Sequence, residues 1–165
     1  MQLEADGLVE IIPRRGATVT RLSLAEVDDV FALRMLLEPR LYEASSPKLD
    51  IAAIEAASLV NEQYRQAIQN QEYDQLGALN AHLHMSLYTN AGMPKTQQIV
   101  ASLLQTSERY TRIQLNSEAA LYQSLTEHDE WLQLTRSGQF SKGRTLLISH
   151  LNYVWQGLRQ VLTKS

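Results

Sequence analysis

Three of the four histidines in this chain occur in stretches with helical patterning, at a spacing that allows them to share a metal ion. His84 follows Asn80 by four residues, and His128 and His150 lie in two later stretches. Neutral imidazole nitrogen is a common protein ligand for zinc, nickel, copper and iron. The chain has no cysteine, so a bound metal must use nitrogen and oxygen donors. Imidazoles delivered by three helices would form the centre of such a site.

Helical spacing places all three of these histidines on inward faces. Asn80 and His84 are four residues apart and share one face of their helix, whereas His82 points almost the opposite way. An inward imidazole needs a polar partner. The alternative to a metal site is therefore three separate core histidines, each bonded to a backbone carbonyl or to a buried hydroxyl such as that of Tyr88 or Tyr153.

The charge of the expected site favours an anionic guest. Three neutral imidazoles and the carbonyl oxygen of Asn80 leave the charge of a dication uncompensated. Arg34 lies on the apolar stripe of the first expected helix, where an unpaired guanidinium would be costly. It can form an intrahelical pair with Glu38, four residues later, or bind a ligand carboxylate bidentately, and both hold together if Glu38 orients Arg34. Arg109 is a second candidate for ligand binding, with a solvated surface arginine as the alternative.

The pattern of apolar residues and breakers predicts an all-α fold, an antiparallel bundle of about six helices preceded by a short β-hairpin. Residues 7–12 and 17–20 flank a turn and give the hairpin. Two capping boxes mark helix starts, and one glycine at the C-terminal end of a helix and two prolines mark where helices stop or are interrupted. The expected helices run from Ser23 to before Pro47, from Asp50 through Ile68, from about Tyr73 to Ala91, across Ile99–Ile113, from Ser124 to Gly138, and from a cap at Ser141 through Leu158.

The bulk composition favours one compact domain away from membranes. The chain has 165 residues, of which 44% are hydrophobic, enough for one independent core. No apolar run approaches the roughly 20 residues needed to cross a bilayer, and the N-terminus does not resemble a signal peptide. The net charge of −3 predicts no general affinity for polyanions. We therefore expect a cytoplasmic protein in which any nucleic-acid contact is local.

Several short motifs, in this order, resemble the effector-binding (FCD) domain of the FadR-like branch of GntR transcription regulators. They are the wing-like segment 7–20, Leu33-Arg34 with Leu37-Glu38, the run Asn80-Ala-His-Leu-His84, Glu127-His128, and Ser149-His150-Leu151. The resemblance covers nearly the whole chain. It implies that residues 1–21 are a remnant of a winged helix-turn-helix, namely the tail of its recognition helix and its wing hairpin. Residues 22–165 would form a helical effector-binding and dimerisation domain.

The resemblance also implies a ligand set for the metal. In metal-binding members of that family an acidic or amide residue and three histidines hold a divalent ion, and a small organic acid binds beside it. By position, the ligands here would be Asn80, His84, His128 and His150, and Arg34 would contact the acid. The usual first ligand is aspartate, so Asn80 is a departure that weakens the expected affinity. We expect zinc as the cofactor, with nickel or manganese as alternatives.

The same resemblance implies DNA as a partner, which this chain is expected to bind only weakly. Arg14 and Arg15 at the wing tip would touch DNA phosphates or the minor groove, but acidic residues lie close to them in the sequence. We therefore expect a shortened form of a regulator that binds DNA poorly by itself and pairs as a homodimer. The other face of the first helix has few polar positions and suits a dimer contact, although core packing is an alternative; it carries Leu33, Met35, Leu36 and Leu37.

Two other functions compete with a metal-dependent sensor. A hydrolase or lyase could use three histidines around an open coordination position. Such an enzyme normally places a carboxylate base near the metal-bound water, whereas Glu127 and Asp129 flank His128 on other faces of its helix. We therefore expect no enzymatic activity. The second alternative is a sensor that has lost the metal and binds a larger acyl ligand.

Overall fold

A computed structural model describes residues 9–12, 16–19, 23–114 and 118–163, with side chains for 23–108, 110 and 118–163. The described residues form six α-helices, as expected for an all-α bundle, joined in part by short 3₁₀ turns. They are α2 (Leu24–Ser45), α3 (Ile51–Gln69), α4 (Leu76–Tyr88), α5 (Pro94–Gln114), α6 (Glu118–Arg136) and α7 (Phe140–Leu162), with η1 (Ser46–Lys48), η2 (Tyr73–Gln75) and η3 (Thr89–Ala91). Ahead of them, β1 (Val9–Ile12) and β2 (Gly16–Val19) pair antiparallel, with Val9 opposite Val19.

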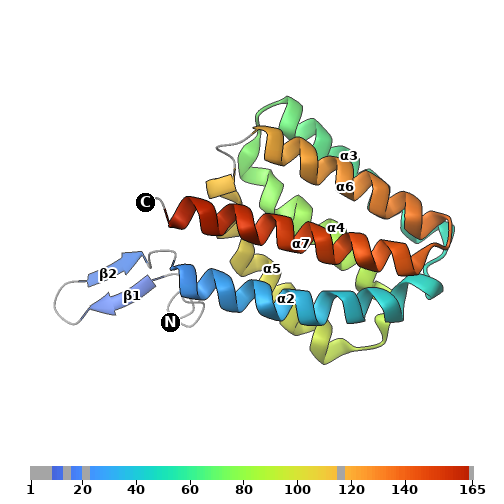
Figure 1. The fold of residues 1–165 in the computed structure, drawn as a ribbon, viewed down its shortest axis with the longest axis horizontal. Coiled ribbons are helices and arrows are strands. Elements are labelled where there is room, and N and C mark those ends of the chain that lie inside the picture. Colours follow the sequence, from blue (N-terminus) through green and yellow to red (C-terminus); the bar gives the residue numbers. More distant parts are fainter. Residues whose placement is uncertain (1–8, 13–15, 20–22, 115–117, 164–165) are drawn as a thin grey trace.

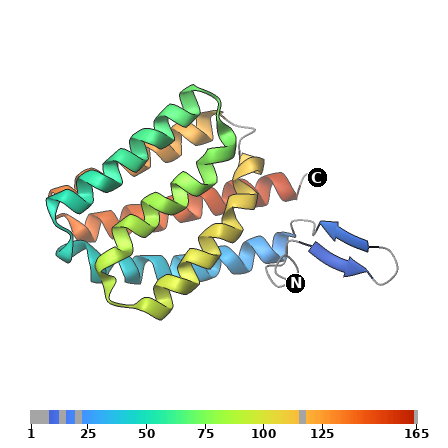
Figure 2. The same cartoon turned by 180° about the vertical axis from the view of Figure 1, so that it is seen from behind.

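The six helices close a ring around a shared interior. α2 packs on α7, α7 on α6, α6 on α3, α3 on α4, α4 on α5, and α5 returns to α2. Figures 1 and 2 show the long α2 and α7 side by side, with α3 and α6 paired at the other side of the bundle. Side chains that point inward from α4, α6 and α7 therefore face a common space. No helix within the described ranges is both long and apolar enough to span a bilayer.

Local sequence signals set several helix ends as expected. The Ser23 hydroxyl accepts a hydrogen bond from the Glu26 amide at 3.1 Å and caps α2. The Asp50 carboxylate does the same for the Ala53 amide at 2.8 Å at the start of α3. Gly138 follows α6 with a φ of 71°, the left-handed conformation that glycine adopts without strain.

Two predicted helix starts are wrong. α6 begins at Glu118 and not at Ser124, whose side chain lies inside the helix and is buried. Leu121 and Leu125 are both buried one turn apart, so tertiary packing extends the helix through the capping sequence. α7 begins at Phe140, before the expected cap at Ser141, and its N-cap residue Gln139 makes no side-chain cap bond.

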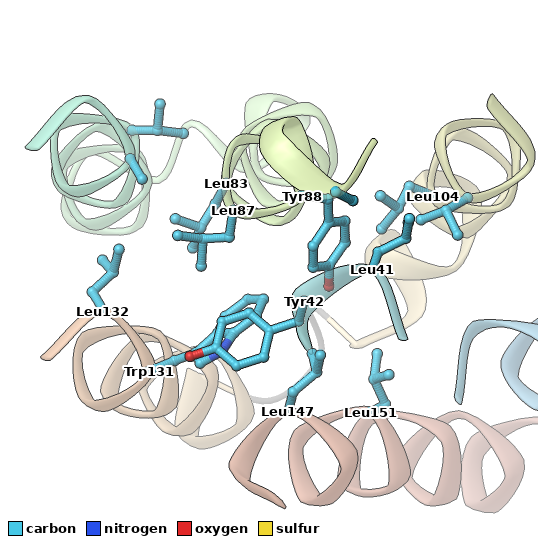
Figure 3. Packing of buried hydrophobic residues seen from close by; sticks show 14 residues of the cluster. Leu41, Tyr42, Leu83, Leu87, Tyr88, Leu104, Trp131, Leu132, Leu147 and Leu151 are labelled. Carbon is cyan, nitrogen blue, oxygen red and sulfur yellow. The ribbon is translucent and has the colours of Figure 1, made fainter. Parts of the chain in front are cut away.

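The main hydrophobic core cluster packs aromatic and aliphatic side chains next to His84. In Figure 3, Tyr42 and Trp131 pack against each other, and Leu147 and Leu151 approach from α7. The ring centroids of Tyr42 and Trp131 are 5.2 Å apart, and the His84 ring lies 5.1 Å from that of Trp131. Because protein interiors are close-packed, this cluster restricts the orientations open to the His84 ring.

The apolar residues on α2 divide between core and surface. Leu36 is 69% exposed and Leu33 is 37% exposed. Met35 and Leu37 are partly buried and pack against the main core cluster. Core packing, the alternative reading of this face, therefore holds for Met35 and Leu37, whose side chains the helical period carries inward.

Candidate metal centre

Three histidines from three helices converge inside the bundle. His84 of α4, His128 of α6 and His150 of α7 have exposed fractions of 0%, 1% and 4%. One nitrogen can be chosen from each ring such that all three lie within 4.8 Å of one another. The ring centroids of His128 and His150 are 5.0 Å apart, and each lies 5.6 Å from that of His84. The prediction that these side chains face inward is confirmed, and His82 is exposed as expected.

The ring nitrogens have the free lone pairs that a metal needs. Nε2 of His84 and both ring nitrogens of His128 are buried without a hydrogen-bond partner among the residues that the structure describes. Burial, followed by the neighbouring histidines, holds the pKa of His128 well below its usual value, and burial also lowers the pKa of His84. Tetrahedral zinc places its nitrogen donors about 3.3 Å apart, which small ring rotations reach from this arrangement. The donor set therefore fits a divalent ion.

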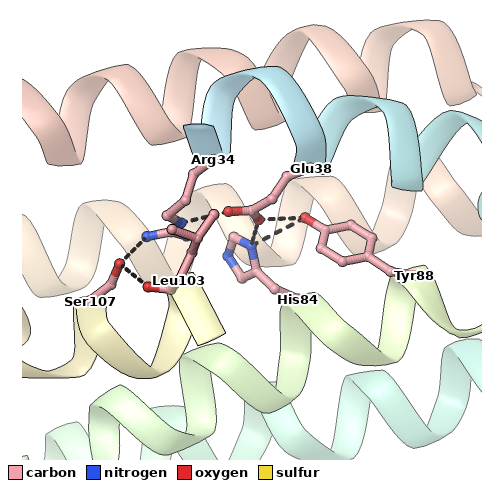
Figure 4. Close-up of polar contacts among 6 residues, drawn as sticks. All are labelled: Arg34, Glu38, His84, Tyr88, Leu103 and Ser107. Carbon is pink, nitrogen blue, oxygen red and sulfur yellow. Dashed lines mark hydrogen bonds and ion pairs between the residues drawn. The ribbon is translucent and has the colours of Figure 1, made fainter. Parts of the chain in front are cut away.

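Glu38 is the centre of a buried hydrogen-bond network that holds His84 (Figure 4). Its Oε2 accepts from His84 Nδ1 at 2.7 Å and from the Tyr88 hydroxyl at 2.6 Å. Its Oε1 accepts from Arg34 Nε at 2.6 Å, which confirms the predicted pair, and Arg34 Nη1 donates to Ser107 at 3.2 Å. Burial raises the pKa of Glu38, but Arg34 and His84 outweigh it and hold that pKa well below its usual value.

Glu127 holds His150 in the same way, through a contact that was not predicted from the sequence. Glu127 Oε2 lies 2.7 Å from His150 Nδ1, and Glu127 Oε1 accepts from Gln123 Nε2 at 2.8 Å. Glu127 lies on another face of α6 than His128, as expected, and α7 brings His150 to that face. Asp129 does point away, toward Asn61 and Arg65 on α3.

A small cavity of about 30 Å³ adjoins His150. Its lining also includes Asn80, Arg34 and Ser107, so a cation and two of the expected metal ligands line the same cavity. Asn80 lies one helical turn before His84 on α4. A cavity of this volume holds one or two water molecules. An organic acid would need the lining side chains to move.

The other predicted contact residues lie outside the described side chains. This applies to Arg109 on α5 and to Arg14 and Arg15 between the two strands. Their expected contacts with ligand and DNA stay predictions.

Comparison with known families decides what kind of domain this is. The family model of the FCD domain matches residues 29–153, which run from within α2 to within α7 and include all four expected metal ligands. The chain belongs to the FCD domain family.

Known proteins that resemble this FCD domain are transcription regulators. A Pseudomonas syringae pv. tomato regulator of the GntR family is 29% identical, and the match covers 99% of this chain and 69% of that one with a TM-score of 0.71. A Streptomyces ambofaciens protein described as an uncharacterized HTH-type transcriptional regulator in an unstable DNA locus is 24% identical over 99% of this chain and 68% of that protein. Escherichia coli McbR/YncC shares the fold, with a TM-score of 0.83 at 14% identity over 99% of this chain and 81% of that one.

These comparisons place the FCD domain among regulators and not among enzymes, which agrees with the sequence-based expectation. The geometry adds a chemical reason. Glu127, one of the two acids next to His128 in the sequence, has its Oε2 bound to His150 Nδ1. A carboxylate occupied in this way orients a ring and is not free to take a proton from water.

The stability of the metal-free FCD domain is expected to fall as the pH drops below about 6.5, the ordinary pKa of histidine. His128 is deprotonated in the fold, but it binds a proton in the unfolded chain, so acid favours unfolding by up to about 1.4 kcal/mol per pH unit. Urea unfolding at pH 7.5, 6.5 and 5.5 measures this slope. His128→Leu should reduce the slope, and exposed His82→Ala should leave it unchanged. Equal slopes in all three proteins would contradict a neutral buried His128.

Proposed function

We propose that this chain is the ligand-sensing domain of a FadR-like GntR transcription regulator of bacteria, which binds a divalent metal and a small organic acid. One observation carries the proposal: three buried histidines from separate helices surround one centre, and His84 Nε2 and both nitrogens of His128 have no partner. Unpartnered buried nitrogens are costly in a core that has no use for them. The proposed ligands are His84, His128, His150 and Asn80.

The donor set favours zinc, with nickel or manganese as alternatives. Three imidazoles and one amide oxygen offer borderline nitrogen donors and no thiolate. Asn80 lines the cavity beside His150, so its carbonyl oxygen can turn toward the centre. Water or a guest bound in the cavity would complete the coordination of the ion.

A small carboxylic acid is the proposed effector because Arg34 lines the same cavity. Its guanidinium binds Glu38 through Nε and Ser107 through Nη1, which holds the group in a fixed orientation. An acid between Arg34 and the metal would satisfy the uncompensated positive charge. The cavity has room for only one or two water molecules in this arrangement of the helices. The acid would therefore favour an arrangement of helices that differs from that of the unliganded protein. This preference is what couples binding to a signal.

The signal would reach DNA through a homodimer. A dimer reads two half-sites at a fixed separation, so a shift in the bundle changes the affinity for an operator. Leu33 and Leu36 are exposed on α2 and suit the contact between the two copies. Arg14 and Arg15 would touch phosphates in a form that carries the complete DNA-binding domain. A regulator of this kind acts in the cytoplasm, where the bacterial genome lies.

Protein purified without a histidine tag is expected to carry one divalent ion per chain and a small acid. Elemental analysis identifies the ion, and native mass spectrometry weighs the co-purified acid. Arg34→Lys keeps the charge that Glu38 needs but loses the planar fork, so this variant should retain the metal and lose the acid. Bound acyl lipid without metal would support the metal-free sensor instead. Equal retention of the acid by Arg34→Lys would remove Arg34 from the binding site.

A further inference from the structure

We infer that Glu127 is the positioning residue of the metal centre, supplying from behind His150 the negative charge that an aspartate would supply at position 80. This inference rests on the proposed metal-binding function and deepens it. Glu127 does not touch the metal in this arrangement. It acts through the imidazole of His150, by fixing which nitrogen carries the proton and by balancing part of the charge of the ion.

The orientation of His150 follows from its contact with Glu127. An ionised carboxylate only accepts hydrogen bonds, so Nδ1 of His150 donates to Glu127 Oε2 across 2.7 Å. The neutral ring then has its lone pair on Nε2. Because Glu127 occupies Nδ1, Nε2 is the nitrogen of His150 that can bind an ion shared with His84 and His128. Gln123 donates to the other oxygen of Glu127 at 2.8 Å and holds the carboxylate in place.

Glu38 orients His84 with the same geometry, but its negative charge is already balanced by Arg34. Arg34 lies 2.6 Å from Glu38 in an ion pair that is almost completely buried, so the pair contributes almost no net charge to the site. Glu127 has only His150 and the neutral Gln123 as partners in the part of the chain that the structure describes. Its side chain is 11% exposed, and at that burial the charge is only partly screened by water.

His128 shows why the charge has to come from Glu127. Within the described ranges both of its ring nitrogens lack a hydrogen-bond partner, so no carboxylate there orients this ring or adds charge behind it. The edge of the Tyr64 ring, with a centroid distance of 5.4 Å, is its main aromatic neighbour besides the other histidines. Asn80 is neutral as well. Among the proposed ligands, only His150 is therefore backed by a carboxylate without a cation of its own.

Glu127→Gln tests the inference because glutamine keeps the shape and can still accept from His150, but it removes the charge. We expect zinc affinity, measured by competition with a chromophoric chelator, to fall about 10–100-fold. The melting temperature of the metal-free protein should change little. Asn80→Asp in the Glu127→Gln background should restore most of the affinity, and it should raise the affinity of the wild-type protein less. A merely structural role for Glu127 would give no such rescue.

Glu130→Gln is the matched control, since Glu130 is an exposed acid on the same helix. Its zinc affinity should equal that of the wild-type protein. A folded Glu127→Gln protein that binds zinc within twofold of the Glu130→Gln protein would overturn the role of Glu127, and so would equal gains from Asn80→Asp in both backgrounds. Failure of the wild-type protein to bind zinc, nickel or manganese would overturn the metal-binding function itself, and with it this inference.

Discussion

Replacing His84 with alanine is expected to remove tight zinc binding and the thermal stabilisation that comes with it. The change deletes one of three converging nitrogens, so the loss should exceed the roughly 100-fold that follows removal of a partner behind a ligand. Zinc at 100 times its dissociation constant stabilises the native wild-type protein by about 2.7 kcal/mol, which raises its melting temperature by roughly 5–11 °C. Differential scanning fluorimetry with and without zinc should show this rise for the wild-type protein and none for the variant.

His82→Ala is the control for the His84 experiment because it removes a histidine from the same helix. His82 is exposed and lies two residues from His84, on the other side of α4. Its variant should keep the full rise in melting temperature with zinc. The comparison uses the zinc-dependent rise and not the melting temperature itself, since His84→Ala also breaks a hydrogen bond to Glu38. Loss of the rise in both variants would show that zinc binds elsewhere.

The inward direction of the three histidines could be predicted because it depends on local periodicity. A residue on the apolar stripe of an amphipathic helix faces the core whichever helix packs against it. The same reasoning gave the pair between Arg34 and Glu38, which are four residues apart on one helix. Convergence of His84, His128 and His150 on one centre depends on how α4, α6 and α7 pack. For that arrangement the sequence offered only the resemblance to a family.

Contacts between distant helices could not be predicted, and they include the residues that orient the histidines. Glu38 and His84 are 46 positions apart, and Glu127 and His150 are 23 positions apart. No helical period relates positions on different helices. A useful signal was present at Glu38, because a carboxylate on an apolar stripe needs more than one donor when it is buried. Glu127 is the last residue of a capping pattern that begins at Ser124, and that local pattern suggested a helix start instead of a partner for His150.

The network around Glu38 links the two halves of the proposed site. One oxygen of Glu38 binds Arg34, which lines the cavity, and the other binds His84 at the histidine centre. An acid that draws Arg34 toward itself therefore changes the field and the position of the carboxylate that orients a metal ligand. Binding of metal and acid should then be coupled energetically, and the coupling must be reciprocal.

Replacing Glu38 with leucine is expected to lower the free energy of unfolding of the metal-free protein by about 3–5 kcal/mol. The variant leaves the Arg34 guanidinium, which is 3% exposed, without its ion-pair partner, and it also leaves the His84 Nδ1 proton and the Tyr88 hydroxyl without their acceptor. Each unsatisfied buried donor adds a desolvation cost. Leucine fills most of the volume of the lost side chain, so an empty cavity contributes little. Equilibrium unfolding in urea measures the difference.

Glu43→Gln is the matched control for Glu38, since it breaks an ion pair with Arg144 at 2.9 Å on the surface of the same helix. Solvent screens that pair, and its loss should cost less than about 1 kcal/mol. Adding Arg34→Met to Glu38→Leu removes the stranded cation and should recover part of the lost stability, because two apolar side chains replace a buried pair at low cost. If Glu38→Leu cost no more than Glu43→Gln, the network would be loosely hydrated, and Glu38 could not hold His84 in one orientation for a metal.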